Sequence, residues 1–203
     1  MDCFTVLTCA DPALEGRTIG ELARGREPGR IIDAVYEASY DTVFDILVDD
    51  PEATWASTID KREYGALSVF LSHPAAMPCT DVGALPAASS GQHGVPPIAY
   101  GLYPHYFREF VRERKALTLE EAVQKATSIP AQRVLGLEDR GVIEEGAYAD
   151  LVVANMDTLC ERGDFLEPAR SPEGIECVFV NGTLVFEHGK HTGHRPGRVL
   201  RRS

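Results

Sequence analysis

A chain of 203 residues with 31 acidic and 20 basic residues carries a formal charge of −11, and a field of that sign repels the phosphates of nucleic acids. With 44% hydrophobic and 25% charged residues, the composition is that of an ordinary globular protein. No apolar stretch approaches the roughly 20 residues that a membrane span needs. The N-terminal residues lack the features of a secretory signal, so we expect a cytoplasmic location.

The five cysteines form no CxxC pair, which argues against a zinc ribbon and a disulfide framework. We interpret most of them as buried free thiols. Cys79, two residues before an aspartate, is interpreted as an inert buried thiol, because no basic neighbour is evident that would lower its pKa.

The first fifty residues predict a strand followed by a helix. FTVLTC at 4–9 is rich in β-branched residues and ends at Asp11-Pro12, which is typical of a buried strand followed by a turn. Apolar residues then recur at helical spacing from Ile31, after Pro28, and a helix is expected to stop at Asp50-Pro51.

A second helix is predicted from a variant capping box, Asp60 with Glu63, up to His73-Pro74. Residues 75–81 then form a short candidate strand that ends at Asp81. The following segment, 82–97, contains so many turn formers that it is predicted to be a loop.

Further along, YFREFVRERKAL predicts an amphipathic helix, and Thr118 with Glu121 makes a capping box for the next one. Leu117 and Ala122 stand where a hydrophobic staple would place them. Residues 131–136 are predicted to form a last short helical turn.

Near residue 140 the pattern changes to short apolar strands separated by glycine turns. Asn181-Gly182, between two apolar strands, predicts a type I′ β-hairpin. The fold class is therefore α/β, with strand–helix units followed by a small antiparallel sheet. Periodicity cannot distinguish an α/β barrel from an open parallel sheet.

Several spaced motifs occur in an order that resembles the N-acyl-D-amino-acid deacylases (D-aminoacylases) of the amidohydrolase superfamily: LTCADPALEGRTIGELA, TDVGAL, YGLYPHYFREFVRERKALTLEEAVQKATSIPAQ, LEDRGVIEEGAYADLVV, VFVNG and TGHRPGRVL. The resemblance implies that residues 1–138 are the last strands and helices of a metal-dependent-hydrolase (β/α)8 TIM barrel. Residues 139–203 would then be a small β-sandwich-type C-terminal domain. The N-terminal part of the family's fold has no counterpart in this chain.

By resemblance, Asp81 is the catalytic general base at the carboxyl end of the final barrel strand, its side chain directed to the barrel axis. It would take a proton from the attacking water and pass it to the leaving amine. The alternative, on spacing alone, is that Asp81 caps the following turn.

The resemblance also implies zinc in complete members, bound by a His-x-His and further histidines that are not matched here. We therefore assign no metal ligand and expect no zinc on this chain alone. His191 and His194 are interpreted as a surface turn. His93 and His105 lie in or beside the loop after Asp81, and we interpret each as a solvated residue, with approach to a substrate as the alternative. Where the family has HPRxYG this chain has PPIAYG, so no substrate-binding residue is assigned.

The implied function is hydrolysis of the linear amide bond of N-acyl-D-amino acids, a non-peptide C–N bond, by an incomplete chain that is inactive by itself. The small-molecule N-acyl amino acid is then the substrate, and a complementing chain or a homo-oligomer supplies what is missing. A non-catalytic remnant and a cyclic-amide hydrolase of the dihydropyrimidinase type stay open as alternatives. A partial barrel should also expose apolar surface.

Overall fold

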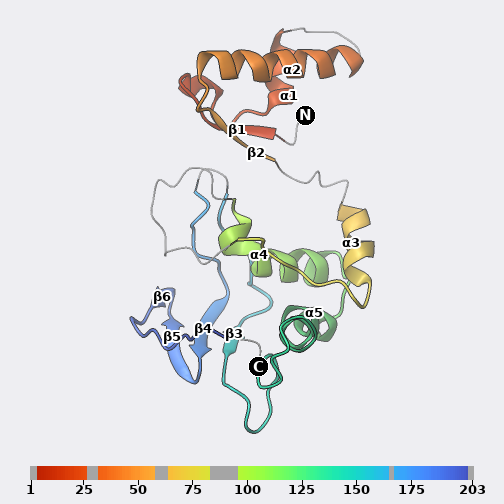
Figure 1. The fold of residues 1–203 in the computed structure, drawn as a ribbon. Helices are drawn as coiled ribbons and strands as arrows, with labels where there is room; N and C mark the ends of the chain where they lie inside the picture. Colours follow the sequence, from red (N-terminus) through yellow and green to blue (C-terminus); the bar gives the residue numbers. More distant parts are fainter. Residues whose placement is uncertain (1–3, 27–31, 58–63, 83–95, 165–166, 201–203) are drawn as a thin grey trace. The chain divides into compact units, whose positions relative to one another are not determined.

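A computed structural model describes residues 4–26, 32–57, 64–82, 96–164 and 167–200, which form two compact units (Figure 1). The first unit comprises Met1–Tyr64, Pro86–Pro97 and Asp164–Ala169, and the second comprises Gly65–Leu85, Ile98–Gly163 and Arg170–Ser203. Both contain helices, and the described strands lie in two sheets, so the mixed α/β class is confirmed. The domain boundary at residue 138 stays a prediction.

The sheet of the first unit has two antiparallel strands. β1 (Phe4–Thr8) is the strand predicted at 4–9, and it pairs with β2 (Thr54–Ser57), where Val6 lies opposite Trp55. No strand was predicted at β2, so the sequence made no prediction about the direction of this pair, which is antiparallel. The direction in which two strands pair depends on the path of the chain between them, which here contains two helices.

Those helices are α1 (Ile19–Arg26) and α2 (Ile32–Asp49). α2 is the predicted helix, whereas α1 was not predicted. A capping box opens α1: the Glu21 N–H donates to Thr18 Oγ1 and the Thr18 N–H donates to a Glu21 carboxylate oxygen, each at 3.1 Å. The Thr-x-x-Glu spacing is visible in the sequence and would have predicted the start of α1.

The core of the first unit gathers Val6, Ile19, Leu22 and Ile46 from β1, α1 and α2. On α2, the side chains at i, i+4 and i+8 are exposed instead: Tyr40 by 56%, Phe44 by 62% and Val48 by 78%. The expected exposed apolar surface is thus present on this helix.

Among its described residues, the second unit has five helical segments and a sheet. These are α3 (Tyr64–Ser72), α4 (Ile98–Tyr106), α5 (Leu119–Ala126) and two π-helical segments, η3 (Phe107–Glu113) and η4 (Ile129–Val134). α3, η3 and α5 fall where helix was predicted, and η4 begins two residues before the predicted turn at 131–136. α4 was not predicted, apart from its last residue, Tyr106. The proposed Asp60–Glu63 cap lies outside the described residues. None of the helices in the described ranges is long and apolar enough to cross a membrane.

The Thr118 capping box is confirmed. Thr118 Oγ1 accepts from the Glu121 N–H at 3.2 Å, and a Glu121 carboxylate oxygen accepts from the Thr118 N–H at 2.9 Å. Leu117 and Ala122, the predicted staple pair, both belong to the buried cluster of this unit, together with Leu71, Tyr106 and Phe110. Local capping thus places α5 against α3, α4 and η3.

The C-terminal strands form one antiparallel sheet in the order β3 (Leu151–Ala154), β4 (Ile175–Val180), β5 (Thr183–Glu187) and β6 (Lys190–His191). The hairpin between β4 and β5 turns at Asn181 and Gly182, with φ of 47° and 78°. Two successive positive φ angles are those of a type I′ turn, so this prediction is confirmed.

A buried arginine links the motif around residue 140 to this hairpin. Arg140, only 8% exposed, donates to Asn181 Oδ1 at 2.8 Å and forms an ion pair with Asp150. Its guanidinium also lies 4.2 Å from the centre of the Tyr148 ring. Asn181 Nδ2 in turn donates to the Pro196 carbonyl at 2.8 Å, which holds the C-terminal segment against the sheet.

Candidate functional site

Asp81, the predicted catalytic residue, lies on an exposed turn rather than at the end of a strand. Residues 75–81 form no strand, which corrects the expectation from sequence, and the φ of Asp81 is 53°. Pro74 and Pro78 each lack an N–H for a sheet ladder, and among the described residues no neighbouring strand pairs with this segment. An extended chain without a partner does not become a strand.

The turn is held by Thr80 rather than by the Asp81 carboxylate. Thr80 Oγ1 accepts from the Val82 N–H at 3.3 Å, and aspartate tolerates the left-handed backbone at position 81. The Asp81 carboxylate makes no hydrogen bond or ion pair with any residue that the structure describes. The carboxylate is therefore exposed and is not engaged by any described residue.

The segment before Asp81 is anchored by a buried lysine. Lys125 of α5, 5% exposed, donates through Nζ to the carbonyls of His73 at 2.5 Å and Ala76 at 3.1 Å. Both carbonyls follow the end of α3, and the His73 carbonyl also accepts from the Ala76 N–H at 2.9 Å. The start of the Asp81 segment is thereby fixed to the helical core.

Cys79 is exposed, and none of the four described cysteines is fully buried, which corrects the expectation of buried thiols. Without a strand at 75–81, no sheet covers Cys79. Burial raises the pKa of Tyr103 on α4, and the charge of Cys79 raises it further.

The histidines are dispersed. His191 ends β6 and His194 follows three residues later, both exposed as predicted, and His191 Nδ1 accepts from the Gly193 N–H at 2.9 Å. His93 lies outside the described residues. His105 is in the last turn of α4 and contacts Glu161, so it is a helix residue rather than a loop residue.

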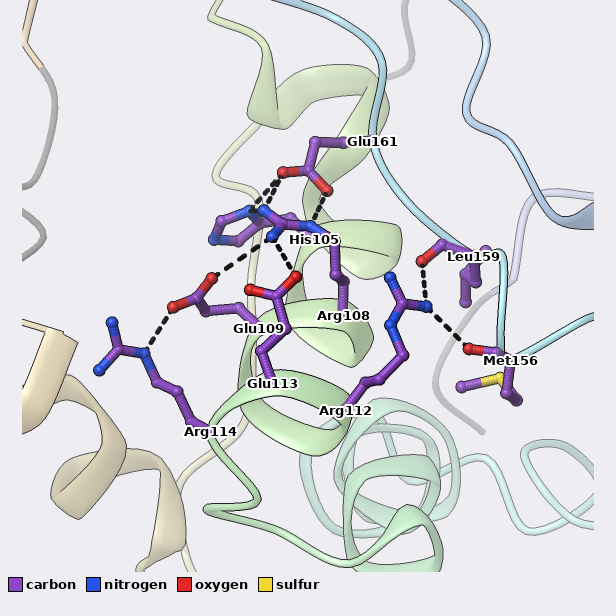
Figure 2. Close-up of polar contacts among 9 residues, drawn as sticks. All are labelled: His105, Arg108, Glu109, Arg112, Glu113, Arg114, Met156, Leu159 and Glu161. Carbon is purple, nitrogen blue, oxygen red and sulfur yellow. Dashed lines mark hydrogen bonds and ion pairs between the residues drawn. The ribbon is translucent and has the colours of Figure 1, made fainter.

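A polar cluster in the second unit surrounds Glu161 (Figure 2). Arg108 donates to both Glu161 carboxylate oxygens, through Nε at 3.0 Å and Nη2 at 2.5 Å, and His105 Nδ1 lies 2.8 Å from Oε1. Arg108 Nη1 also donates to Glu113 at 2.7 Å. Arg112, one turn further on, donates to the carbonyls of Met156 at 2.8 Å and Leu159 at 3.0 Å.

The charges around Glu161 indicate that this residue connects structural elements and does not act as a proton acceptor. Burial opposes ionisation of Glu161, but hydrogen bonds with His105 and Arg108 outweigh it and lower the pKa of Glu161 to about 2. A carboxylate with this pKa, both of whose oxygens are engaged, is a poor general base. We interpret the cluster as joining α4 and η3 to residues 156–161.

The described residues do not fit a zinc site. Within the ranges that the structure covers, no group of three or more His, Cys, Asp or Glu side chains is arranged to hold a metal ion. Structural and catalytic zinc sites use at least three such side chains.

The Glu161 cluster gives an acid-stability prediction. The pKa of Glu161 falls from its ordinary 4.5 to about 2 on folding, so the ionised group stabilises the fold above pH 4.5 and this contribution is lost as the pH falls toward 2. As the pH falls from 4.5 to about 2, the free energy of unfolding should decrease by about 1–3 kcal/mol more for the wild type than for Glu161→Gln. Urea unfolding at several pH values measures this, with the exposed Glu145→Gln as control. Parallel profiles for wild type and Glu161→Gln would contradict it.

The sequence had indicated an amphipathic helix at residues 106–117 but neither Arg108 nor Glu161 as partners. A charged residue on a helix is usually solvated, and these two are 53 positions apart. No local signal in the sequence could have paired them.

The chain is similar in sequence to known proteins. Residues 87–186 match the amidohydrolase family. The chain is 45% identical over 118 residues to an N-acyl-D-glutamate deacylase of Alcaligenes xylosoxydans xylosoxydans, a match that covers 55% of this chain and 24% of that protein.

Two solved structures resemble nearly the whole chain. A crystal structure of D-aminoacylase has a TM-score of 0.69 at 29% identity, covering 98% of this chain and 38% of that one. An N-acyl-D-glutamate deacylase of Bordetella bronchiseptica, solved with zinc and a phosphonate inhibitor, has a TM-score of 0.65 at 29% identity, covering 99% and 38%. The chain is therefore a relative of the N-acyl-D-amino-acid deacylases of the amidohydrolase superfamily and spans only a part of their length.

Proposed function

We propose that this chain is one part of a hydrolase that cleaves the linear amide bond of N-acyl-D-amino acids. The observation that carries the proposal is its 45% identity over 118 residues to an N-acyl-D-glutamate deacylase. Because the chain spans 24% of that protein, the remaining residues of the active site come from polypeptide outside this sequence. A complementing chain is the form of partner that we propose.

In this proposal Asp81 is the general base. Its exposed carboxylate, free of hydrogen bonds to described residues, accepts a proton from the attacking water and returns it to the nitrogen as the C–N bond breaks. The Lys125 anchor at His73 and Ala76 positions the segment that carries it. Zinc is present in the Bordetella bronchiseptica relative, and its ligands would belong to the complementing part.

The same proposal assigns the two parts of the chain to two domains of the deacylase fold. Residues 1–138 are the closing portion of a TIM barrel, and residues 139–203 belong to a small β-sandwich-type domain completed by the other part. The likeness to D-aminoacylase over 98% of this chain supports this assignment. The exposed stripe of Tyr40, Phe44 and Val48 on α2 is consistent with a fold that continues beyond this chain.

The test is reconstitution. The purified chain is mixed and refolded with a polypeptide comprising the unmatched part of the N-acyl-D-glutamate deacylase, then supplied with zinc. We expect the mixture to release amine from N-acetyl-D-glutamate but not from its L-enantiomer, while the chain alone does neither and binds less than one zinc per molecule. Turnover by the chain alone with stoichiometric zinc would overturn the divided-site proposal, and an inactive mixture in which both parts are folded and associated would overturn the assigned activity.

A further inference from the structure

A cavity of about 280 Å³ lies in the first unit and takes no part in the proposed hydrolysis. Its lining residues come from α1, α2 and the turn before α1: Leu14, Arg17, Leu22, Gly25, Thr42 and Ile46. The volume is nearly twice that of an apolar cavity of about 150 Å³ that holds benzene, and is close to the lower limit of about 300 Å³ for small-molecule pockets. It therefore has room for a ligand somewhat larger than benzene.

The inner walls are apolar and built into the core. Leu22 is 7% exposed and Ile46 is 5% exposed, and both belong to the buried cluster of this unit. Thr42, 1% exposed, donates its hydroxyl proton to the Ala38 carbonyl at 2.7 Å and so offers the cavity only an acceptor. These walls favour a hydrocarbon group.

The rim carries a cation without a partner. Arg17 is exposed, and its guanidinium has no ion pair or hydrogen bond with the residues that the structure describes. Two carboxylates close to Arg17 in the sequence accept backbone hydrogen bonds instead: Glu21 from the Thr18 N–H at 3.1 Å and Glu15 from the Cys9 N–H at 3.4 Å. Arg17 thus has its five donors available for an anion from solution.

From this combination we propose that the cavity binds a small carboxylate with an apolar substituent, the carboxylate on Arg17 and the substituent between Leu22 and Ile46. A single guanidinium beside apolar walls suits a monoanion, because the second negative charge of a phosphate ester would have no positive counter-charge. The site is independent of the proposed hydrolase activity.

Gly25 provides a variant that fills the cavity. It lies in α1, and a Cβ built there meets no atom within 4 Å, so a leucine side chain has space to enter and the helix gains a better helix former. The probes are phenylacetate and its uncharged counterpart phenylacetamide. Binding is followed by ¹⁵N NMR titration of the full chain.

We expect the wild type to bind phenylacetate at least tenfold more tightly than phenylacetamide. Arg17→Gln should abolish that preference, and Gly25→Leu should weaken both probes at least tenfold. Two matched controls should leave both affinities unchanged: Arg133→Gln, at an exposed arginine outside the cavity, and Gly65→Leu, in α3 with equally open surroundings.

Equal affinity for the two probes, or phenylacetate binding that survives both Arg17→Gln and Gly25→Leu, would overturn the proposal. Circular dichroism of each variant establishes that it is folded. If Gly25→Leu does not fold, Gly25→Ala, whose smaller side chain fills less of the cavity, provides the second measurement. If the affinity for phenylacetate is unchanged in both Gly25→Ala and Arg17→Gln, the proposal is also overturned.

Discussion

Gly174→Ala should destabilise the fold by about 3 kcal/mol or more, because it would introduce both backbone strain and a steric clash. Gly174 has φ of 86°, and a Cβ would lie 2.6 Å from both the N and the Cα of Leu159. That backbone cannot easily move, since the Leu159 N–H donates to the Asn155 carbonyl at 2.9 Å and the Asn155 N–H donates to the Gly174 carbonyl at 2.8 Å. Urea denaturation of both proteins measures the loss.

Gly182→Ala is the matched control for backbone strain. Gly182 has a similar φ of 78°, but a Cβ there meets nothing within 4 Å. Its loss should be about 1 kcal/mol, the cost of a left-handed backbone alone. Equal losses at positions 174 and 182 would show that the close approach of Gly174 to Leu159 does not determine stability.

Asp81→Asn should lower turnover of N-acetyl-D-glutamate by the reconstituted, zinc-supplied assembly at least about 100-fold, the lower limit for removal of a positioned general base. The same change should leave the unfolding free energy of the isolated chain unaltered. The Asp81 carboxylate is exposed, makes no hydrogen bond with the described residues, and occupies a backbone with φ of 53° that asparagine also adopts readily. The initial rate of amine release and the urea midpoint measure the two effects.

Asp157→Asn, at another exposed aspartate of the second unit, is the control and should leave turnover unchanged. An assembly that retains full activity with Asp81→Asn would disprove the role assigned to Asp81. A large loss of stability in the isolated chain would instead indicate a structural role for this side chain.

Elements that depend on a few neighbouring residues could be predicted from the sequence. The strand at 4–9, the Thr118 capping box and the Asn181-Gly182 hairpin all occur as expected. In each case the signal and the structure lie within the same short segment, where backbone geometry and local hydrogen bonds decide the outcome. The missed capping box at Thr18 is of the same kind and was equally available.

Contacts between distant segments were decided only by the tertiary structure. The antiparallel pairing of β1 with β2, the absence of a strand at 75–81 and the engagement of Glu161 by Arg108 each depend on which segments meet in space. A strand needs a partner to satisfy its backbone, and a charge acquires a lowered pKa only where its counter-charges are brought together. Arg108 and Glu161 are thus visible in the sequence, but their association is a property of the folded chain.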